Sequence, residues 1–339
     1  MINLKIAVDA MGGDLAPHET VKGAALASLT VDGKIMLVGD SAETERILKS
    51  CEYKKEAIEI IHTTEVITND DKPTSAIRKK KDSSLVKCFN LVQSGEADGI
   101  VSAGSTGALL AGSVHFLKRL SGVSRPALSP LLPSAKNGFI IVDGGANTNS
   151  RPNNLLQFAI MGSIYMEKVV GIKNPRVGLL NIGSEDEKGT ELTRAAYALI
   201  SESGVNFVGN VEGRDPIAGV CDVVVCDGFA GNVLLKATEG VGSVLFSSIK
   251  DILLSSPLSK VAAMFLKKGL YTLKRKYDYK EYGGAPFLGV SGCVIKAHGT
   301  SDAKSISSAI RQAFDFAKSG ALSDMEKQIN NKGGAGIDI

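Results

Sequence analysis

Glycine-rich segments that could bind an anion recur along the chain, each directly after an apolar run. Glycine lets the backbone approach a ligand closely, and the first N–H groups of a following helix carry roughly half a positive charge. Such segments are typical of sites for a phosphate or a phosphate-bearing ligand. The candidate ligand-binding residues that they supply are Asp9, Gly12, Gly13, Asp14, Gly104, Ser105, Thr106, Asn147, Asn181 and Gly183.

A second candidate is the segment KAHGTSDAK at 296–304, a turn that leads into a predicted helix. Thr300 or Ser301 would cap this helix, which would leave free N–H groups beside His298 and Lys304. Two cationic side chains at a helix start favour an anion or an oxyanion pocket. Lys188, in the charged run EDEKG at 185–189, is a weaker candidate of the same kind.

Sequence motifs for several other kinds of binding and catalysis are absent from the chain. The chain has neither the GxGxxG fingerprint of dinucleotide binding nor a Walker lysine loop, which disfavours NAD and ATP. The four histidines show no metal-ligand spacing, and no GxSxG nucleophile elbow is present. We therefore expect no cofactor, no metal and no catalytic triad.

The elements that would position these segments alternate between strand and helix. Continuous apolar runs, typical of strands buried on both faces, are LKIAVDA, KIMLVGD, GIVSAG, GFIIVDGG, RVGLLNIG, NFVGNV and DVVVCDG. Helical stretches such as 19–29, 155–170 and 191–202 separate them. This order predicts an α/β fold, a three-layer α/β/α sandwich with a mostly parallel sheet. In such sheets ligands bind beyond the carboxyl ends of the strands.

Composition narrows the class further. A formal net charge of +3 over 339 residues argues against nucleic-acid binding. No segment approaches the roughly 20 apolar residues of a membrane span, and no leader is visible at the N-terminus. The five cysteines form no CxxC pair and are interpreted as buried free thiols. These features favour a cytoplasmic location.

One segment departs from the α/β pattern. Residues 257–276 carry six basic residues and no acidic one, with apolar residues near helical spacing. Such an amphipathic helix either packs on the protein or contacts an anionic membrane or an acidic partner. We expect a single catalytic domain over residues 1–330, a protruding helical segment at about 251–280, and a tail at 331–339. The predicted membrane or carrier contacts are Lys260, Phe265, Leu266, Lys267, Lys268 and Leu270.

The sequence resembles the bacterial phosphate acyltransferase (PlsX) family of phospholipid synthesis over residues 5 to about 316. The matching blocks include DAMGGD (9–14), SAGSTGA (102–108), LLQFAIMGS (155–163), NFVGNVEGRD (206–215), CDGFAGNVLLK (226–236) and HGTSDAK (298–304). The chain departs from the family pattern at Ser105, usually Asn, and at Gly144, usually a hydrophobic residue. The resemblance implies a fold like that of phosphotransacetylases and isopropylmalate dehydrogenases.

The resemblance further implies transfer of a long-chain acyl group from acyl carrier protein to inorganic phosphate. The acyl phosphate formed would feed a glycerol-3-phosphate acyltransferase, and the enzyme would be a homodimer associated peripherally with the membrane. On this hypothesis Asn147 and Asn232 help to build the phosphate and carbonyl pocket. His298 and Lys304 would face the developing negative charge, and Asp227 would orient one of these cations.

Other functions remain open on the sequence alone. A short-chain phosphotransacetylase that uses coenzyme A would share the fold and the anion-binding segments. A dehydrogenase of the isopropylmalate type fits less well, because no nicotinamide fingerprint is present. A non-catalytic membrane scaffold for lipid enzymes would account for the basic segment but not for the glycine-rich strand ends.

Overall fold

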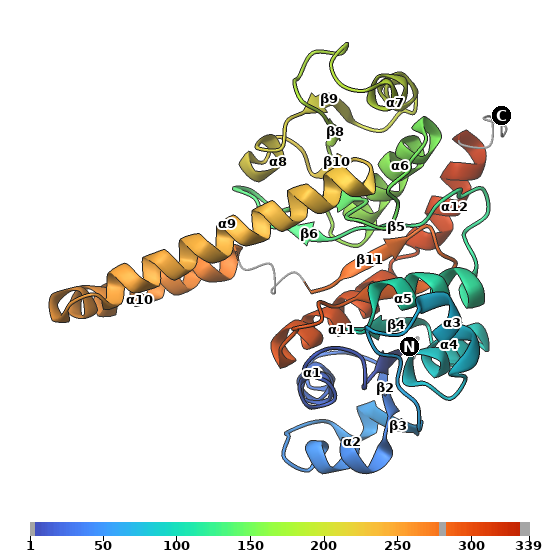
Figure 1. Ribbon diagram of the computed structural model, residues 1–339, viewed down its shortest axis with the longest axis vertical. Helices are drawn as coiled ribbons and strands as arrows, with labels where there is room; N and C mark the ends of the chain where they lie inside the picture. The colour runs from blue at the N-terminus through green and yellow to red at the C-terminus, as the bar shows by residue number, and fades with distance from the viewer. Residues whose placement is uncertain (1–3, 278–282, 333–339) are drawn as a thin grey trace.

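The protein contains two sheets that are mostly parallel (Figure 1). A computed structural model describes residues 4–277 and 283–332. The first sheet has the order β3-β2-β1-β4-β12-β11-β5, in which β11 pairs antiparallel with both β12 and β5. Its strands are β1 (Lys5–Asp9), β2 (Lys34–Gly39), β3 (Ile58–His62), β4 (Gly99–Ser102), β5 (Ala127–Leu128), β11 (Ala285–Leu288) and β12 (Cys293–Lys296).

The second sheet has the order β6-β7-β10-β8-β9, and β6 is its antiparallel edge. Its strands are β6 (Leu131–Leu132), β7 (Phe139–Val142), β8 (Val177–Leu180), β9 (Phe207–Val211) and β10 (Val223–Val225). The predicted α/β sandwich is confirmed, and each of the seven apolar runs named above contains a strand. The parallel strands are divided between two sheets.

Helices cover both faces of each sheet. They are α1 (His18–Ser28), α2 (Ser41–Leu48), η1 (Lys55–Ala57), α3 (Pro73–Lys79), α4 (Ser84–Gln93), α5 (Thr106–Gly112), η2 (Ser113–Leu117), α6 (Pro152–Lys168), α7 (Glu191–Ser201), α8 (Asp215–Ala218), α9 (Gly228–Leu254), α10 (Pro257–Tyr277), α11 (Ala303–Lys318) and α12 (Ala321–Lys332). The predicted tail at 331–339 thus starts inside α12, and residues 333–339 lie outside the described residues.

Strand alternation explains why the apolar runs are continuous. In β1, Ile6 and Val8 face a core shared with α1 and α11, whereas Ala7 faces the core under α4 and α5. In β7, Ile140 belongs to the first of these cores and Ile141 to a third, which α9 covers. The first core includes buried residues of both sheets, so apolar packing is continuous between the two halves.

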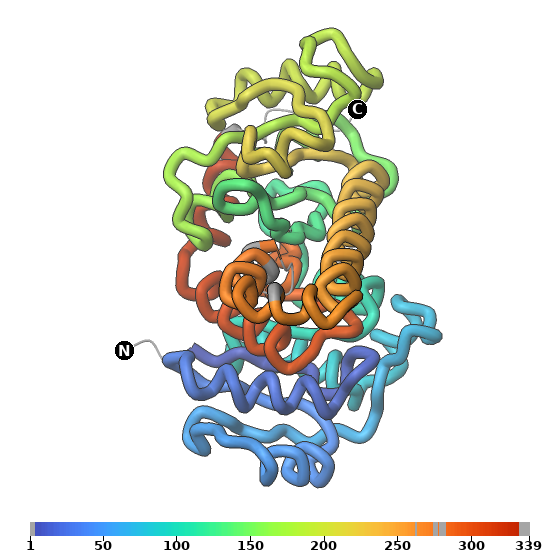
Figure 2. Tube along the Cα trace, turned by 90° about the vertical axis from the view of Figure 1, so that its left-hand side faces the viewer, coloured from blue at the N-terminus to red at the C-terminus, as the bar shows by residue number. Residues whose placement is uncertain are grey.

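Helices α9 and α10 form a hairpin that projects from the body, the α9–α10 hairpin (Figure 1). Figure 2 views the molecule from the side toward which the hairpin points, and the hairpin lies between the two halves. The predicted protrusion is present, but its first limb is the distal part of α9 and therefore begins before residue 251. Residues 278–280 of the predicted segment lie outside the described residues.

Candidate active site

A buried carboxylate organises the carboxyl edge of the first sheet. Asp9 ends β1 and is 2% exposed. Its oxygens accept hydrogen bonds from Ser84 Oγ at 2.6 Å and from Ser102 Oγ at 2.7 Å. Burial raises the pKa of Asp9, and these hydrogen bonds oppose that shift. Because its oxygens are engaged inside the protein, Asp9 positions the strand ends around it.

The ends of β1, β4 and β12 converge at this edge. The Asp14 N–H donates to the Gly299 carbonyl at 2.8 Å, which ties the loop after β1 to the loop after β12. Gly13 has φ +114°, and a Cβ there would lie 2.9 Å from the Cβ of Ala103. The Cα of Gly12 lies 3.5 Å from the position that a Cβ of Gly104 would take. The structure therefore brings together residues 9–14, 102–104 and 296–299.

Lys296, the last residue of β12, is the most buried cation of this group. It is 9% exposed, and its Nζ donates to the carbonyls of Ala103, at 3.2 Å, and of Ala297. An ammonium has three donors, so these two bonds leave one for a ligand. Burial lowers the pKa of Lys296 to about 8, against the opposing charges of Asp14 and Asp9.

His298 follows Lys296 by two residues and faces solvent. Its Nδ1 accepts a hydrogen bond from the Thr300 N–H at 3.3 Å and lies 2.9 Å from Thr300 Oγ1. A backbone N–H can only donate, so the neutral ring carries its proton on Nε2. Burial lowers the pKa of His298, and the charge of Lys236 lowers it further. The neutral imidazole can therefore donate one hydrogen bond, from Nε2.

Lys236 joins this group from the second half of the protein. It lies on α9, and its charge lowers the pKa of both Lys296 and His298. Its Nζ pairs with Glu239 Oε2 at 2.7 Å. Asn232 is one helical turn earlier on α9, so it shares the Lys236 face of the helix. We call Lys236, Lys296 and His298 the cation cluster.

The start of α9 is held by the carboxyl edge of the second sheet. Asp143, directly after β7, is fully buried and accepts hydrogen bonds from the N–H groups of Gly145, Ala146 and Asn147. Burial raises the pKa of Asp143, and these bonds oppose the shift. The Asn147 carbonyl accepts from the Gly228 N–H at 2.8 Å, so this loop fixes the first turn of α9.

Asp227 was predicted to orient a catalytic cation, and the described contacts of its side chain lie at the start of α9. Its Oδ1 accepts from the N–H groups of Phe229 at 2.8 Å and Ala230 at 2.9 Å, so it is the N-cap of α9. These contacts assign Asp227 to positioning the helix that carries Asn232 and Lys236. Asn147 is similarly engaged, since its side-chain amide donates to Asp143 and to the Pro126 carbonyl.

The predicted cap of the helix after His298 was wrong. Asp302, rather than Thr300 or Ser301, is the N-cap of α11, and it accepts from the Ser305 N–H at 2.9 Å. Glu19 Oε2 accepts from the Ala303 N–H at 2.8 Å. Two carboxylates therefore occupy the helix start where free N–H groups were expected. Lys304 lies exposed on the first turn of α11.

The remaining candidates fall into two further places. Ser105 caps α5 by accepting from the Ala108 N–H at 3.4 Å, and Thr106 is exposed beside it. The loop after β8 is closed on itself, because Asn181 donates to the Lys188 carbonyl at 3.0 Å and accepts from its neighbour's N–H. Gly183 is packed against this loop. The described contacts do not connect Asn181, Gly183 or Lys188 to the cation cluster.

Two members of the cation cluster, Lys236 and Lys296, were not among the residues predicted from the sequence. Lys296 ends a four-residue strand, CVIK, which is too short to stand out as an apolar run. The available signal was a lysine that follows a short apolar stretch, residues 293–295, and precedes His298 by two residues. Lys236 had none, because its position depends on how α9 crosses from one sheet to the other.

Comparison with known proteins identifies relatives over nearly the whole chain. Residues 4–323 match a family model described as "Fatty acid synthesis protein". A phosphate acyltransferase of Alkaliphilus oremlandii is 51% identical over 330 residues, which covers 97% of this chain and 98% of the relative.

Solved structures share the fold at low identity. A phosphotransacetylase of Streptococcus pyogenes superposes with a TM-score of 0.62 at 17% identity, over 93% of this chain and 94% of that one. A 4-hydroxythreonine-4-phosphate dehydrogenase of Klebsiella pneumoniae gives 0.50 at 13% identity, over 93% and 98%. Solved structures of a phosphotransacetylase and of a dehydrogenase therefore both share the fold of this chain. On the evidence of the family model and of a relative about half identical over nearly its whole length, the chain is an acyltransferase that belongs to the phosphate acyltransferase family.

Proposed function

We propose that the protein transfers a long-chain acyl group from acyl carrier protein to inorganic phosphate, giving an acyl phosphate for phospholipid synthesis. The observation that carries the proposal is the cation cluster, in which the charge of Lys236 in one half acts on Lys296 and His298 of the other. Two ammonium groups and an imidazole N–H at the carboxyl edge of a parallel sheet suit a small dianion. The residues described here, 4–277 and 283–332, would act as one catalytic unit.

The reaction needs no covalent intermediate on the protein. A substantial fraction of inorganic phosphate is the dianion at neutral pH, and the dianion is already a nucleophile. Its oxygen attacks the thioester carbonyl, the new carbon–oxygen bond forms, and a tetrahedral oxyanion results. Lys296 and Lys236 would hold the phosphate, and His298 Nε2–H would donate to the oxyanion. The carbon–sulfur bond then breaks, and the thiolate leaves readily because a thiol has a pKa of about 8.5.

The direct test is a donor comparison with the purified protein. Palmitoyl carrier protein, palmitoyl-CoA and acetyl-CoA are each incubated with and without inorganic phosphate, and free thiol and acyl phosphate are followed. We expect phosphate-dependent turnover with palmitoyl carrier protein. Preference for acetyl-CoA would favour a short-chain phosphotransacetylase instead. No phosphate-dependent turnover with any donor, from folded protein, would favour a non-catalytic scaffold.

The pKa of Lys296 predicts a specific pH dependence. The kcat/KM for phosphate reports the free enzyme, so it should rise as the phosphate dianion forms around neutral pH and fall as Lys296 loses its proton near pH 8. The sign follows because only the ammonium form attracts the dianion. Initial rates at low phosphate between pH 5.5 and 9.5 measure this profile. A flat response from pH 7.5 to 9.5 would remove Lys296 from phosphate binding.

The exposed face of the α9–α10 hairpin supports membrane association. Phe265 is 86% exposed and Leu258 is 80% exposed, and neighbouring positions on both helices are also apolar and exposed. Lys260, Lys267 and Lys268 add positive charge beside them. None of the described helices is long and apolar enough to cross a bilayer. We propose peripheral contact with an anionic membrane surface, beside a downstream glycerol-3-phosphate acyltransferase, and a homodimer in the cytoplasm.

The hairpin's membrane role predicts the effect of two substitutions. Leu266 is 55% exposed and Leu270 is half-buried, so Leu266→Glu combined with Leu270→Glu places two negative charges on the basic face. We expect co-sedimentation with anionic liposomes to fall about ten-fold, through lost apolar burial and charge repulsion. Turnover of a soluble short-chain thioester should be retained. Unchanged sedimentation would count against membrane contact through this hairpin.

A further inference from the structure

A second basic surface lies on α3 and the residues that follow it, far along the chain from the α9–α10 hairpin. Between Lys72 and Lys81 the chain has five cations and no acidic residue. Lys72, Arg78, Lys79 and Lys81 are exposed, whereas the apolar residues of α3 are buried. We call these four exposed cations the α3 patch. Unlike the hairpin, this surface is charged without being apolar.

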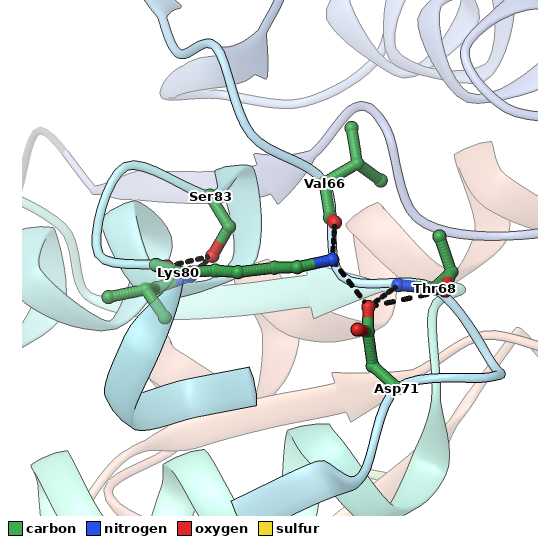
Figure 3. Close-up of polar contacts among 6 residues, drawn as sticks. Val66, Thr68, Asp71, Lys80 and Ser83 are labelled. Carbon is green, nitrogen blue, oxygen red and sulfur yellow. Dashed lines mark hydrogen bonds and ion pairs between the residues drawn. The ribbon is translucent and has the colours of Figure 1, made fainter. Parts of the chain in front are cut away.

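The fifth cation, Lys80, explains why the others face solvent. Its Nζ donates to Asp71 Oδ2 at 2.6 Å and to the Val66 carbonyl at 2.8 Å (Figure 3). The Thr68 N–H donates to the same Asp71 oxygen, at 2.8 Å. The ion pair with Lys80 lowers the pKa of Asp71, so the carboxylate stays charged and paired. Lys80 thus holds the end of α3 in place, and the charge of Asp71 is paired with Lys80.

Two further acidic residues, Asp70 and Asp82, flank the patch and are exposed. Asp82 Oδ2 accepts from the hydroxyl of Thr64 at 2.6 Å and from the Thr64 N–H at 2.9 Å. The ion pairs found among the described residues involve none of Lys72, Arg78, Lys79 and Lys81. The four cations of the α3 patch outnumber the two exposed acidic residues that flank them, Asp70 and Asp82, so this surface carries a net positive charge.

The patch adjoins the active site on both sides. Pro73, at the start of α3, lies 2.8 Å from the position that a Cβ of Gly107 would take, so α3 touches the first turn of α5, which follows β4. Three residues beyond Lys81, Ser84 donates to the buried carboxylate of Asp9. The patch and the carboxyl edge of the first sheet are thus parts of one fixed segment.

We propose that the α3 patch docks the acidic carrier protein that brings the acyl thioester. The inference rests on the proposed function. It assigns carrier docking and membrane contact, which were both predicted for residues of α10, to two different surfaces. An acidic, soluble partner matches a charged surface with buried apolar residues, through steering and rim contacts. A lipid surface matches the hairpin, whose apolar side chains are exposed. On this proposal the carrier protein contacts α3, and not the residues of α10 named in the sequence-based prediction.

The test compares two triple variants with the same change in charge. Arg78→Glu/Lys79→Glu/Lys81→Glu reverses the patch and leaves Lys80 in place. Lys49→Glu/Lys54→Glu/Lys55→Glu changes three exposed cations beside η1 and serves as the control. For each, kcat/KM is measured with palmitoyl carrier protein and with palmitoyl-pantetheine, which has no carrier surface, at low salt.

We expect the patch variant to lose about ten-fold or more in kcat/KM for the carrier thioester and less than about two-fold for the pantetheine thioester. The control variant should change little with either donor. Equal losses with both donors, or equal losses in both variants, would overturn the inference. So would loss of carrier turnover in the Leu266→Glu/Leu270→Glu protein with none in the patch variant.

Binding of unacylated carrier protein, followed by fluorescence anisotropy, keeps the inference independent of turnover. Weaker binding to the patch variant than to the control supports docking at α3 even if wild-type protein turns over neither donor. That second result would contradict the proposed function and not the docking surface. Equal binding by wild type and both variants would contradict docking at α3.

Discussion

Replacing Lys296 with Met lowers kcat/KM for phosphate by about 100- to 1000-fold, the range found when a preorganised charge-stabilising donor is removed. Lys296 is a buried cation at the end of a central strand, and the position of its Nζ is fixed by two carbonyls. Met has a similar length without charge or donors, so the main change is the loss of attraction for the phosphate dianion. Steady-state rates over a range of phosphate concentrations measure the effect.

Stability should respond differently. The pKa of Lys296 in the fold is about 8, below its ordinary value, so burying its charge opposes folding, fully below pH 8 and progressively less as pH rises toward 10.5. Met removes that cost but leaves two carbonyls without a donor. We therefore expect a Tm within a few degrees of wild type at pH 7. Lys318→Met, at an exposed position on α11, is the matched control. A Lys296→Met protein that keeps its fold and full kcat/KM would contradict the phosphate role.

Replacing His298 with Ala lowers kcat by about 100-fold and changes the KM for phosphate much less. The neutral ring is held by the Thr300 N–H with its proton on Nε2, where it can meet the developing oxyanion. That hydrogen bond strengthens only when the carbonyl oxygen becomes negative, so the loss appears in kcat. Single-turnover rates with saturating phosphate isolate the step.

Two further variants sharpen this result. His298→Asn supplies an amide donor at shorter reach and should recover part of the lost kcat. His115→Ala removes an exposed histidine of η2 and should leave kcat unchanged. If His298→Ala raises the KM for phosphate and spares kcat, His298 binds phosphate instead. If it changes neither, His298 has no part in the reaction.

Much of the fold could be predicted from the sequence because the strands are buried on both faces. Runs such as GFIIVDGG and DVVVCDG have no alternation, and both faces of the corresponding strands β7 and β10 are buried. The predicted helices 19–29, 155–170 and 191–202 correspond to α1, α6 and α7 within three residues. The division into two sheets could not be predicted, because it depends on which strands pair.

One feature of the candidate site could be predicted for the same reason. Strand ends of one parallel sheet meet at the same edge, so Asp9 and Gly104, which follow two apolar runs, could be placed at one edge. The predicted helix cap was wrong, because Asp302, and not Thr300 or Ser301, caps α11. Lys236 lay beyond prediction, since only the tertiary path of α9 brings it to His298.

The central claim is that phosphate attacks the thioester directly, at the cation cluster, without an acyl-enzyme. The most direct measurement mixes protein in stoichiometric amount with palmitoyl carrier protein by rapid quench, first without phosphate and then with it. We expect no burst of free thiol until phosphate is added, followed by equal amounts of thiol and acyl phosphate. A thiol burst equal to the protein concentration without phosphate would show a covalent acyl-enzyme and contradict the account.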